Sequence, residues 1–125
     1  MPHYWRPVGA TPKEVPLINY TPHTVTVRPV AGGEFLFPAF GLVPRVEMKS
    51  VDAGDHCGCP CIRVEYGAAE LPAGETGPCI VSTLFADAYR RQHGDDGVEL
   101  FVPDSGPSAI RENGQIVAVR ALIRR

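Results

Sequence analysis

The chain has 125 residues, of which 44% are hydrophobic and 21% charged, and its formal net charge is −2. These values are typical of one soluble globular domain. The near-neutral charge gives no general attraction to nucleic acid or to an anionic membrane. No apolar run approaches the roughly 20 residues that span a bilayer. Residues 1–16 lack an apolar signal segment, which predicts a cytoplasmic protein without stable disulfides.

The 13 prolines and 13 glycines are spread along the whole chain. Because proline interrupts both helices and central strands, this distribution predicts many short segments and a β-rich fold. Residues 1–16 contain four prolines and are predicted to form an N-terminal arm. Residues 17–125 are predicted to form a single β-rich domain.

Alternation of apolar and polar residues and short apolar runs predict strands over residues 24–30, 34–37, 45–51, 61–66, 79–81, 98–102 and 115–123. Residues 52–60 are predicted to form a loop. The dipeptide Asn113-Gly114 predicts a type I′ hairpin turn, because both residues tolerate positive φ. The expected strands are mostly antiparallel and form a small sheet or a partly closed barrel.

One helix is predicted at about residues 83–93. Leu84, Phe85, Ala88 and Tyr89 fall at helical spacing, Ser82 or Thr83 can cap the first turn, and Gly94 can end the last one. The predicted fold class is therefore α+β, mostly β, with one helix packed on the sheet.

A cluster of soft metal ligands stands out in the sequence. His56, Cys57 and Cys59 are close together, and thiolates with an imidazole suit zinc. Cys79 is the only distant thiol, so the candidate zinc site is His56, Cys57, Cys59 and Cys79. The spacing differs from the usual pairs of cysteines two residues apart. In the alternative interpretation, Cys61 and Cys79 are small buried hydrophobes and the other two cysteines lie in a loop.

Asn19, Thr21 and His23 form a compact polar corner next to Pro22. They could contact a ligand, with His23 as a general base. Alternatively, Asn19 and Thr21 bond the backbone of the turn.

Asp104 and Ser105, with His23 or His93, suggest a hydrolase. The chain has no nucleophile elbow, however, and the run Pro103 to Pro107 is well explained as a turn.

Several arginines lie in predicted strands and could hold a phosphate or carboxylate by paired hydrogen bonds. They are Arg45, Arg63, Arg111 and Arg120. The alternative is ordinary cross-strand pairing with glutamates. The chain has no glycine-rich phosphate loop, and its aromatic residues are not interleaved with basic ones. Nucleic acid is therefore not favoured as a partner.

An ordered series of motifs runs from Leu17 to Ile123, and the main ones are Asn19-Tyr20-Thr21-Pro22-His23, Pro38-Ala39-Phe40-Gly41, Val64-Glu65-Tyr66-Gly67, Cys79-Ile80-Val81-Ser82 and Pro103-Asp104-Ser105-Gly106. This series resembles a family of small uncharacterised proteins of tailed phages, prophages and actinobacteria. Its members read Asn-Leu-Thr-Pro-His and Pro-Asp-Thr-Gly, so Tyr20 and Ser105 depart from the pattern. The resemblance implies an accessory protein of phage type, in the host cytoplasm if phage-encoded, and implies no particular activity. The N-terminal arm and the cysteine segment look like additions.

The leading hypothesis is a non-catalytic binding module for a small anionic ligand, such as a nucleotide, or for a host protein. The predicted binding residues are Asn19, Thr21, His23, Arg45, Asp104, Ser105, Arg111 and Arg120. These residues are grouped because most of them lie in turns or at strand ends, which are expected to come together at one edge of the sheet. The alternatives are a hydrolase using His23 with Asp104 or Ser105, and a zinc-stabilised interaction protein. An exposed edge strand would also allow a homodimer.

Overall fold

The computed structural model describes residues 4–5 and 15–125. Its elements are β1 (Tyr4–Trp5), β2 (Val15–Pro16), β3 (Ile18–Asn19), β4 (Val25–Val27), β5 (Phe35–Phe37), β6 (Met48–His56), β7 (Cys59–Tyr66), β8 (Cys79–Ile80), α1 (Thr83–His93), β9 (Leu100–Pro103), β10 (Ile110–Glu112), β11 (Gln115–Ala118) and β12 (Leu122–Arg124). The predicted N-terminal arm lies mostly outside the described residues; the two short strands β1 and β2 pair with each other.

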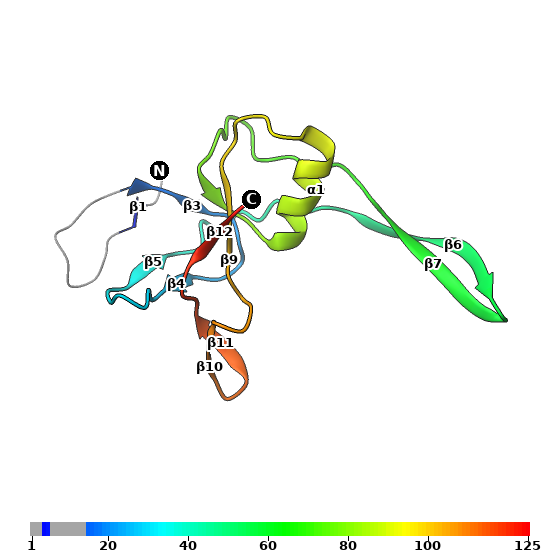
Figure 1. Cartoon of the computed structure of the whole chain (residues 1–125). Helices are drawn as coiled ribbons and strands as arrows, with labels where there is room; N and C mark the ends of the chain where they lie inside the picture. The colour runs from blue at the N-terminus through cyan, green and yellow to red at the C-terminus, as the bar shows by residue number, and fades with distance from the viewer. Residues whose placement is uncertain (1–3, 6–14) are drawn as a thin grey trace.

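The fold is mostly β, with one helix in the described part of the chain, as predicted (Figure 1). The strands form several small sheets, and none of these sheets is closed. The largest has four strands in the order β12-β9-β8-β3. No helix in the described residues is long and apolar enough to cross a membrane.

The four-stranded sheet differs from the expected antiparallel arrangement. β8 runs parallel to both β3 and β9, and only β12 is antiparallel to its neighbour. The reason is the connection between β8 and β9, which contains α1 and returns the chain to the same end of the sheet. β8 is fully buried, as expected for a short apolar strand covered on both faces.

The core lies on both faces of this sheet. On one face, Phe85 and Tyr89 of α1 pack with Cys79, Val81 and other buried residues. On the other face, Ile80 packs with residues from β4, β5 and the segment after β11. Neighbouring residues of one strand thus enter different clusters, because side chains alternate along a strand.

The ends of α1 follow the local sequence signals. Ser82 Oγ accepts a hydrogen bond from the Phe85 N–H at 3.1 Å, and the Gly94 N–H donates to Arg90 O at 2.9 Å. The apolar stripe is shifted, since Ala86 is buried and Leu84 is 43% exposed. The predicted boundaries of the helix are therefore confirmed, and its buried face is rotated slightly.

Two hairpins leave the body of the molecule. In β10–β11, Asn113 and Gly114 have φ of 52° and 79°, which confirms the predicted turn. β6 and β7 form a long two-stranded ribbon that projects from the body (Figure 1). The predicted loop over residues 52–60 was wrong, because most of it continues the two strands. The turn is Cys57-Gly58, with φ of 51° and 85°.

Candidate functional site

The Asn19 corner, residues 19–23, is held together by the Asn19 side chain. This side chain is fully buried, and its Nδ2 donates to His23 O at 2.9 Å and to Phe37 O at 2.7 Å. Its Oδ1 accepts from the N–H of Thr21 at 2.9 Å and lies 2.6 Å from the Thr21 hydroxyl. Both polar atoms of Asn19 are thus committed to the fold, which leaves the exposed His23 as the polar side chain of the corner that faces solvent.

The predicted binding residues of the β9–β10 connection are also engaged within the protein. Asp104 accepts hydrogen bonds from the Gly106 N–H at 3.3 Å and from the Ser108 hydroxyl at 3.2 Å. Arg111 donates to the carbonyls of Ser105 and Gly106. These bonds shape the turn, as an Asx turn does.

The strand arginines do not converge on one pocket. Arg120 donates to Arg28 O at 3.2 Å, whereas Arg111 binds the turn after β9 and Arg63 lies in the projecting ribbon 3.6 Å from Glu65. Arg45 is exposed and lies beside the start of α1, where it lines a cavity. Of the predicted anion-binding arginines, Arg45 is therefore the one that lines a cavity together with Ser82, the N-cap residue of α1.

The four predicted zinc ligands are not brought together. Cys79 is fully buried in β8, whereas His56, Cys57 and Cys59 are exposed at the end of the ribbon. Burial, and then the nearby Glu75 carboxylate, raise the pKa of the Cys79 thiol to about 12, which keeps the thiol protonated. Among the described residues, no group of three or more His, Cys, Asp or Glu side chains is arranged to hold a metal ion. Cys79 had been included as the only distant thiol, and the structure places it in the body, away from the three ligands at the end of the ribbon.

A cleft of about 260 Å³ lies at the carboxyl ends of the three parallel strands. Thr21 and His23 follow β3, Ser82 follows β8, and Pro103 is the last residue of β9. The far wall is residues 116–119 of β11 and the segment after it. Hydrogen bonds between Val119 and residues 26 and 28 hold this wall beside β4. Ligands of open parallel sheets commonly bind at this edge.

A second cavity, of about 310 Å³, also has Ser82 in its lining. Pro22, Arg45 and Leu84 contribute to its lining. Ser82 is therefore the residue shared by the lining of the cleft that contains His23 and the lining of the cavity that contains Arg45. The full linings are Thr21, His23, Thr24, Val25, Thr26, Ser82, Pro103, Ile116, Val117, Ala118 and Val119 for the first, and Pro22, Val43, Pro44, Arg45, Val46, Met48, Ser82, Leu84 and Phe85 for the second.

Among the described residues, neither cavity has a carboxylate in its lining. The first turn of α1 also contains no acidic residue. The cavity near Arg124 is different, because Asp95 and Glu99 line it beside the arginines. An anion placed near Ser82 would thus meet no negative side chain from the described part of the lining, and it would lie near the positive end of the α1 dipole.

The hydrolase arrangement is not formed. In the part of the chain that the structure describes, no hydrogen bond or ion pair joins His23 to Asp104 or Ser105. Asp104 is bound within its own turn, and neither Asp104 nor Ser105 lines the cleft that contains His23. No observation therefore favours a His23-based hydrolase over a binding site.

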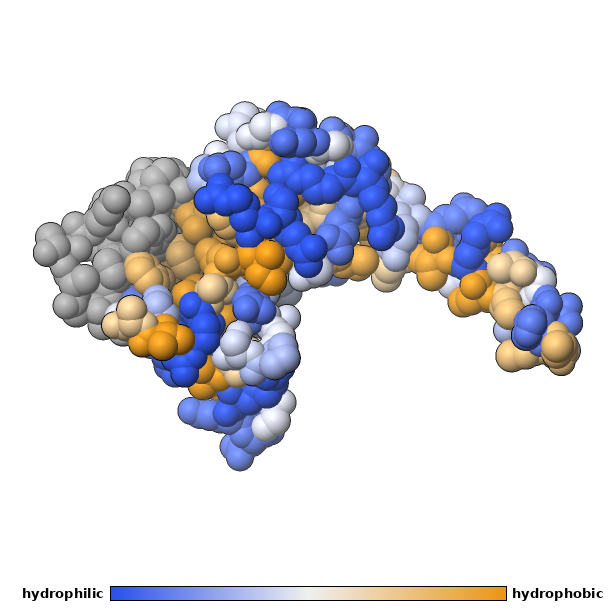
Figure 2. All heavy atoms as spheres, viewed as in Figure 1, coloured by the Kyte–Doolittle hydropathy of each residue, from blue (hydrophilic) through white to orange (hydrophobic). Residues whose placement is uncertain are grey.

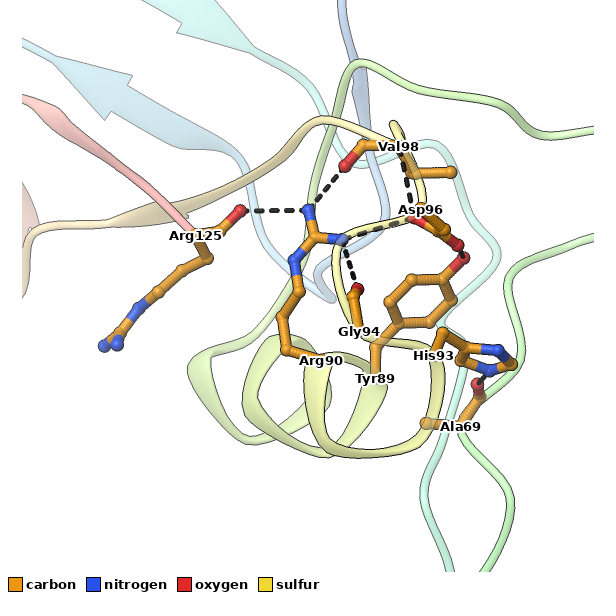
Figure 3. Close-up of polar contacts among 8 residues, drawn as sticks. All are labelled: Ala69, Tyr89, Arg90, His93, Gly94, Asp96, Val98 and Arg125. Carbon is orange, nitrogen blue, oxygen red and sulfur yellow. Dashed lines mark hydrogen bonds and ion pairs between the residues drawn. The ribbon is translucent and has the colours of Figure 1, made fainter.

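Sequence reasoning missed a polar cluster at the end of α1, centred on Arg90 (Figure 3). The Arg90 guanidinium donates to Val98 O, to Gly94 O at 3.1 Å and to Arg125 O at 3.0 Å. It also lies 3.3 Å from Asp96 Oδ1. The sequence signal for Arg90 was a basic residue in the last turn of the helix. This signal predicts a favourable interaction with the helix dipole, but it does not predict hydrogen bonds to distant carbonyl groups. The cluster joins α1 to the segments that enter β9 and follow β12.

The Tyr89 hydroxyl donates to Asp96 Oδ2 at 2.6 Å within this cluster. That hydrogen bond, followed by the bond from the Val98 N–H, holds the pKa of Asp96 below its ordinary value. The same hydrogen bond, together with burial, raises the pKa of Tyr89 to about 12.

The substitution Tyr89→Phe is expected to weaken the acid dependence of stability. Because the folded pKa of Asp96 is lowered, its stabilisation is present above about pH 4 and is lost as the pH falls through the folded pKa. Tyr89→Phe removes the main cause, so the stability difference from the wild type should shrink as the pH falls from about 5 to 2. Urea denaturation at several pH values measures this difference; a constant difference would contradict the assignment.

Comparisons of the chain with protein-family models, with curated proteins and with solved structures find no match. The resemblance to small phage and actinobacterial proteins therefore stays a prediction from the sequence motifs.

Proposed function

We propose that this chain is a non-catalytic binding module that holds a small anionic ligand beside Ser82, between His23 and Arg45. The observation that carries the proposal is the position of the cleft. Residues at the end of β9 and just after β3 and β8 line it, at the edge where α1 begins. Such an edge gathers loop side chains and helix N–H groups around one ligand.

The charge distribution supports an anion as the ligand. The N–H groups of the first turn of a helix have no acceptors within the helix, and here the Phe85 N–H is the one bonded to the Ser82 cap. Arg45 is the guanidinium beside this turn, and guanidinium groups bind phosphate and carboxylate by paired hydrogen bonds. In residues 15–125, neither cavity lining contributes a carboxylate that would repel the ligand.

The shape of the cleft supports a ligand that also has an apolar part. Ile116 and Val117 are 43% and 37% exposed, and they form the wall opposite the Asn19 corner. A small organic phosphate or carboxylate, such as a nucleotide, would place its anionic group near Ser82 and its organic part against this wall. An accessory role of phage type is consistent with such a module and rests on the sequence resemblance.

The substitutions His23→Ala and Arg45→Gln are each expected to weaken anion binding about tenfold or more, because a hydrogen bond to a charged group contributes roughly 1.5–3 kcal/mol. Calorimetric titration with inorganic phosphate, a nucleoside monophosphate and a dicarboxylate measures the affinities. The matched controls are Arg111→Gln and Arg120→Gln, whose guanidinium groups bind backbone carbonyls away from Ser82.

Two results would contradict the proposed function. One is that none of the three anions binds the wild-type chain. The other is that the Arg111 and Arg120 variants lose as much affinity as the Arg45 variant, since the anion would then not be held beside Ser82.

A further inference from the structure

The β6–β7 ribbon exposes a row of apolar side chains on one of its faces. Met48 pairs with Tyr66, and alternation along β7 places Val64 and Ile62 on the same face. These four side chains are 58%, 40%, 43% and 65% exposed, in that order. Figure 2 shows hydrophobic residues along the ribbon where it leaves the body. A lone two-stranded ribbon is only marginally stable in water, so this exposed row indicates an interaction surface.

The outer edge of β7 has a regular set of backbone groups available for pairing. The Gly67 N–H donates to Glu47 O at 2.7 Å, so Gly67 faces β6. Because antiparallel strands alternate between inward and outward backbone groups, Glu65 and Arg63 also face β6. Ile62, Val64 and Tyr66 consequently direct their N–H and C=O groups to the other side, where β7 has no neighbouring strand in the described residues.

The sequence of β7 is self-complementary about Val64. Arg63 and Glu65 flank this residue, and Ile62 and Tyr66 lie one position further out. If a second β7 lies antiparallel to the first with Val64 opposite Val64, each Arg63 is opposite Glu65 of the second copy. In the same register, each Ile62 is opposite Tyr66 of the second copy. Opposite charges and apolar pairs in these positions stabilise a sheet.

This register is also compatible with backbone hydrogen bonding. It places the N–H and C=O groups of Ile62, Val64 and Tyr66, which point away from β6, opposite the same groups of the second copy. This arrangement allows about six hydrogen bonds between the two β7 edges. Within one chain, Arg63 and Glu65 are 3.6 Å apart and their side chains are 67% and 54% exposed, so this pair contributes little by itself. Both side chains are therefore free to take cross-strand partners.

The edge of β6 is a poorer surface for pairing. The ladder is irregular between Asp52 and Asp55, and the Asp52 carboxylate binds the Gly54 N–H at 2.8 Å. Bulges and charges of this kind protect edge strands from association. A two-fold axis at Ser50 would also place Lys49 opposite Val51, which gives no ion pair.

We propose that two copies of this chain associate through their β7 edges, centred on Val64, to form a four-stranded antiparallel sheet. The two apolar rows then become one continuous patch of eight side chains, four from each copy. Arg91 of α1 contacts one end of this patch, because its guanidinium lies 5.7 Å from the centre of the Tyr66 ring. The cleft near Ser82 is not part of this interface.

Charge reversal in β7 tests the register. Sedimentation equilibrium is expected to show a dimer for the wild-type chain. Arg63→Glu and Glu65→Arg should each raise the dissociation constant about tenfold or more, because two like-charge pairs then face each other. The double variant with both changes should regain the wild-type dimer, since its charges are again complementary. Glu112→Lys, a charge reversal on the exposed β10–β11 hairpin outside the proposed interface, is the control and should have little effect.

A second variant tests the edge itself. Val64→Pro removes an outward-facing N–H and leaves the bonds to β6 in place, so it should give a folded monomer, with folding checked by circular dichroism. A wild-type chain that stays monomeric at about 1 mM would overturn the proposal. So would a dimer that none of the β7 variants weakens, or single charge reversals that the double variant does not repair.

Discussion

The substitution Asn19→Ala is expected to lower the free energy of unfolding by about 3–5 kcal/mol, because it removes the hydrogen bonds that this buried amide makes to three backbone groups. Asn19 is fully buried and donates to the carbonyls of His23 and Phe37, and it accepts from the Thr21 N–H. Each unsatisfied buried group costs roughly 1–3 kcal/mol. Urea denaturation of the variant and the wild type measures the loss.

Two further variants separate hydrogen bonding from packing at this corner. Asn19→Asp keeps the shape of the side chain but removes its donor, so a comparable loss is expected at neutral pH. Thr21→Val removes only the hydroxyl that lies 2.6 Å from Asn19 Oδ1, and a loss of about 1 kcal/mol is expected. A loss below about 1 kcal/mol for Asn19→Ala would show that the corner does not depend on this amide.

Arg90→Met is the second substitution with a large expected effect, a loss of about 2–4 kcal/mol of stability. The guanidinium joins three backbone carbonyls and the Asp96 carboxylate, and its side chain is 23% exposed. Methionine keeps most of the apolar stem, so the loss should come from the hydrogen bonds. Thermal or urea denaturation measures the change.

Arg91→Met is the matched control, since Arg91 follows Arg90 in α1 and lies over the exposed Tyr66 ring. We expect it to cost less than about 1 kcal/mol. Arg90→Lys should recover only part of the wild-type stability, because an ammonium group cannot reach the same set of acceptors as a planar guanidinium. Equal losses for the Arg90 and Arg91 methionine variants would contradict the assigned role of Arg90.

The elements that the sequence predicted well are those that depend on neighbouring residues. The start and end of α1 depend on Ser82 and Gly94, and the β10–β11 turn depends on Asn113-Gly114. Each signal acts over a few residues and needs no knowledge of the tertiary fold.

The features that the sequence did not predict depend on distant partners. The parallel alignment of β3, β8 and β9 results from the α1 crossover, and short strands do not show their direction in their sequence. The loop predicted over residues 52–60 is a ribbon because both of its faces are exposed, so polar residues need not interrupt the strands. In each case, tertiary contacts outweigh the local pattern.

The candidate site was predicted only in part for the same reason. His23 and Arg45 lie at cavities next to Ser82. Asn19 instead binds Phe37 O, 18 residues away, and Arg120 binds Arg28 O, 92 residues away. Sequence alone cannot show that such polar groups are already satisfied within the fold.

An amide NMR titration of the wild-type chain with inorganic phosphate and a nucleoside monophosphate tests the central claim most directly. Binding beside Ser82 predicts that the largest chemical-shift changes occur at His23 and at residues 82–85, with smaller changes along residues 116–119. Unchanged spectra would contradict the claim, and so would changes confined to Arg111 or to the arginines at 124 and 125.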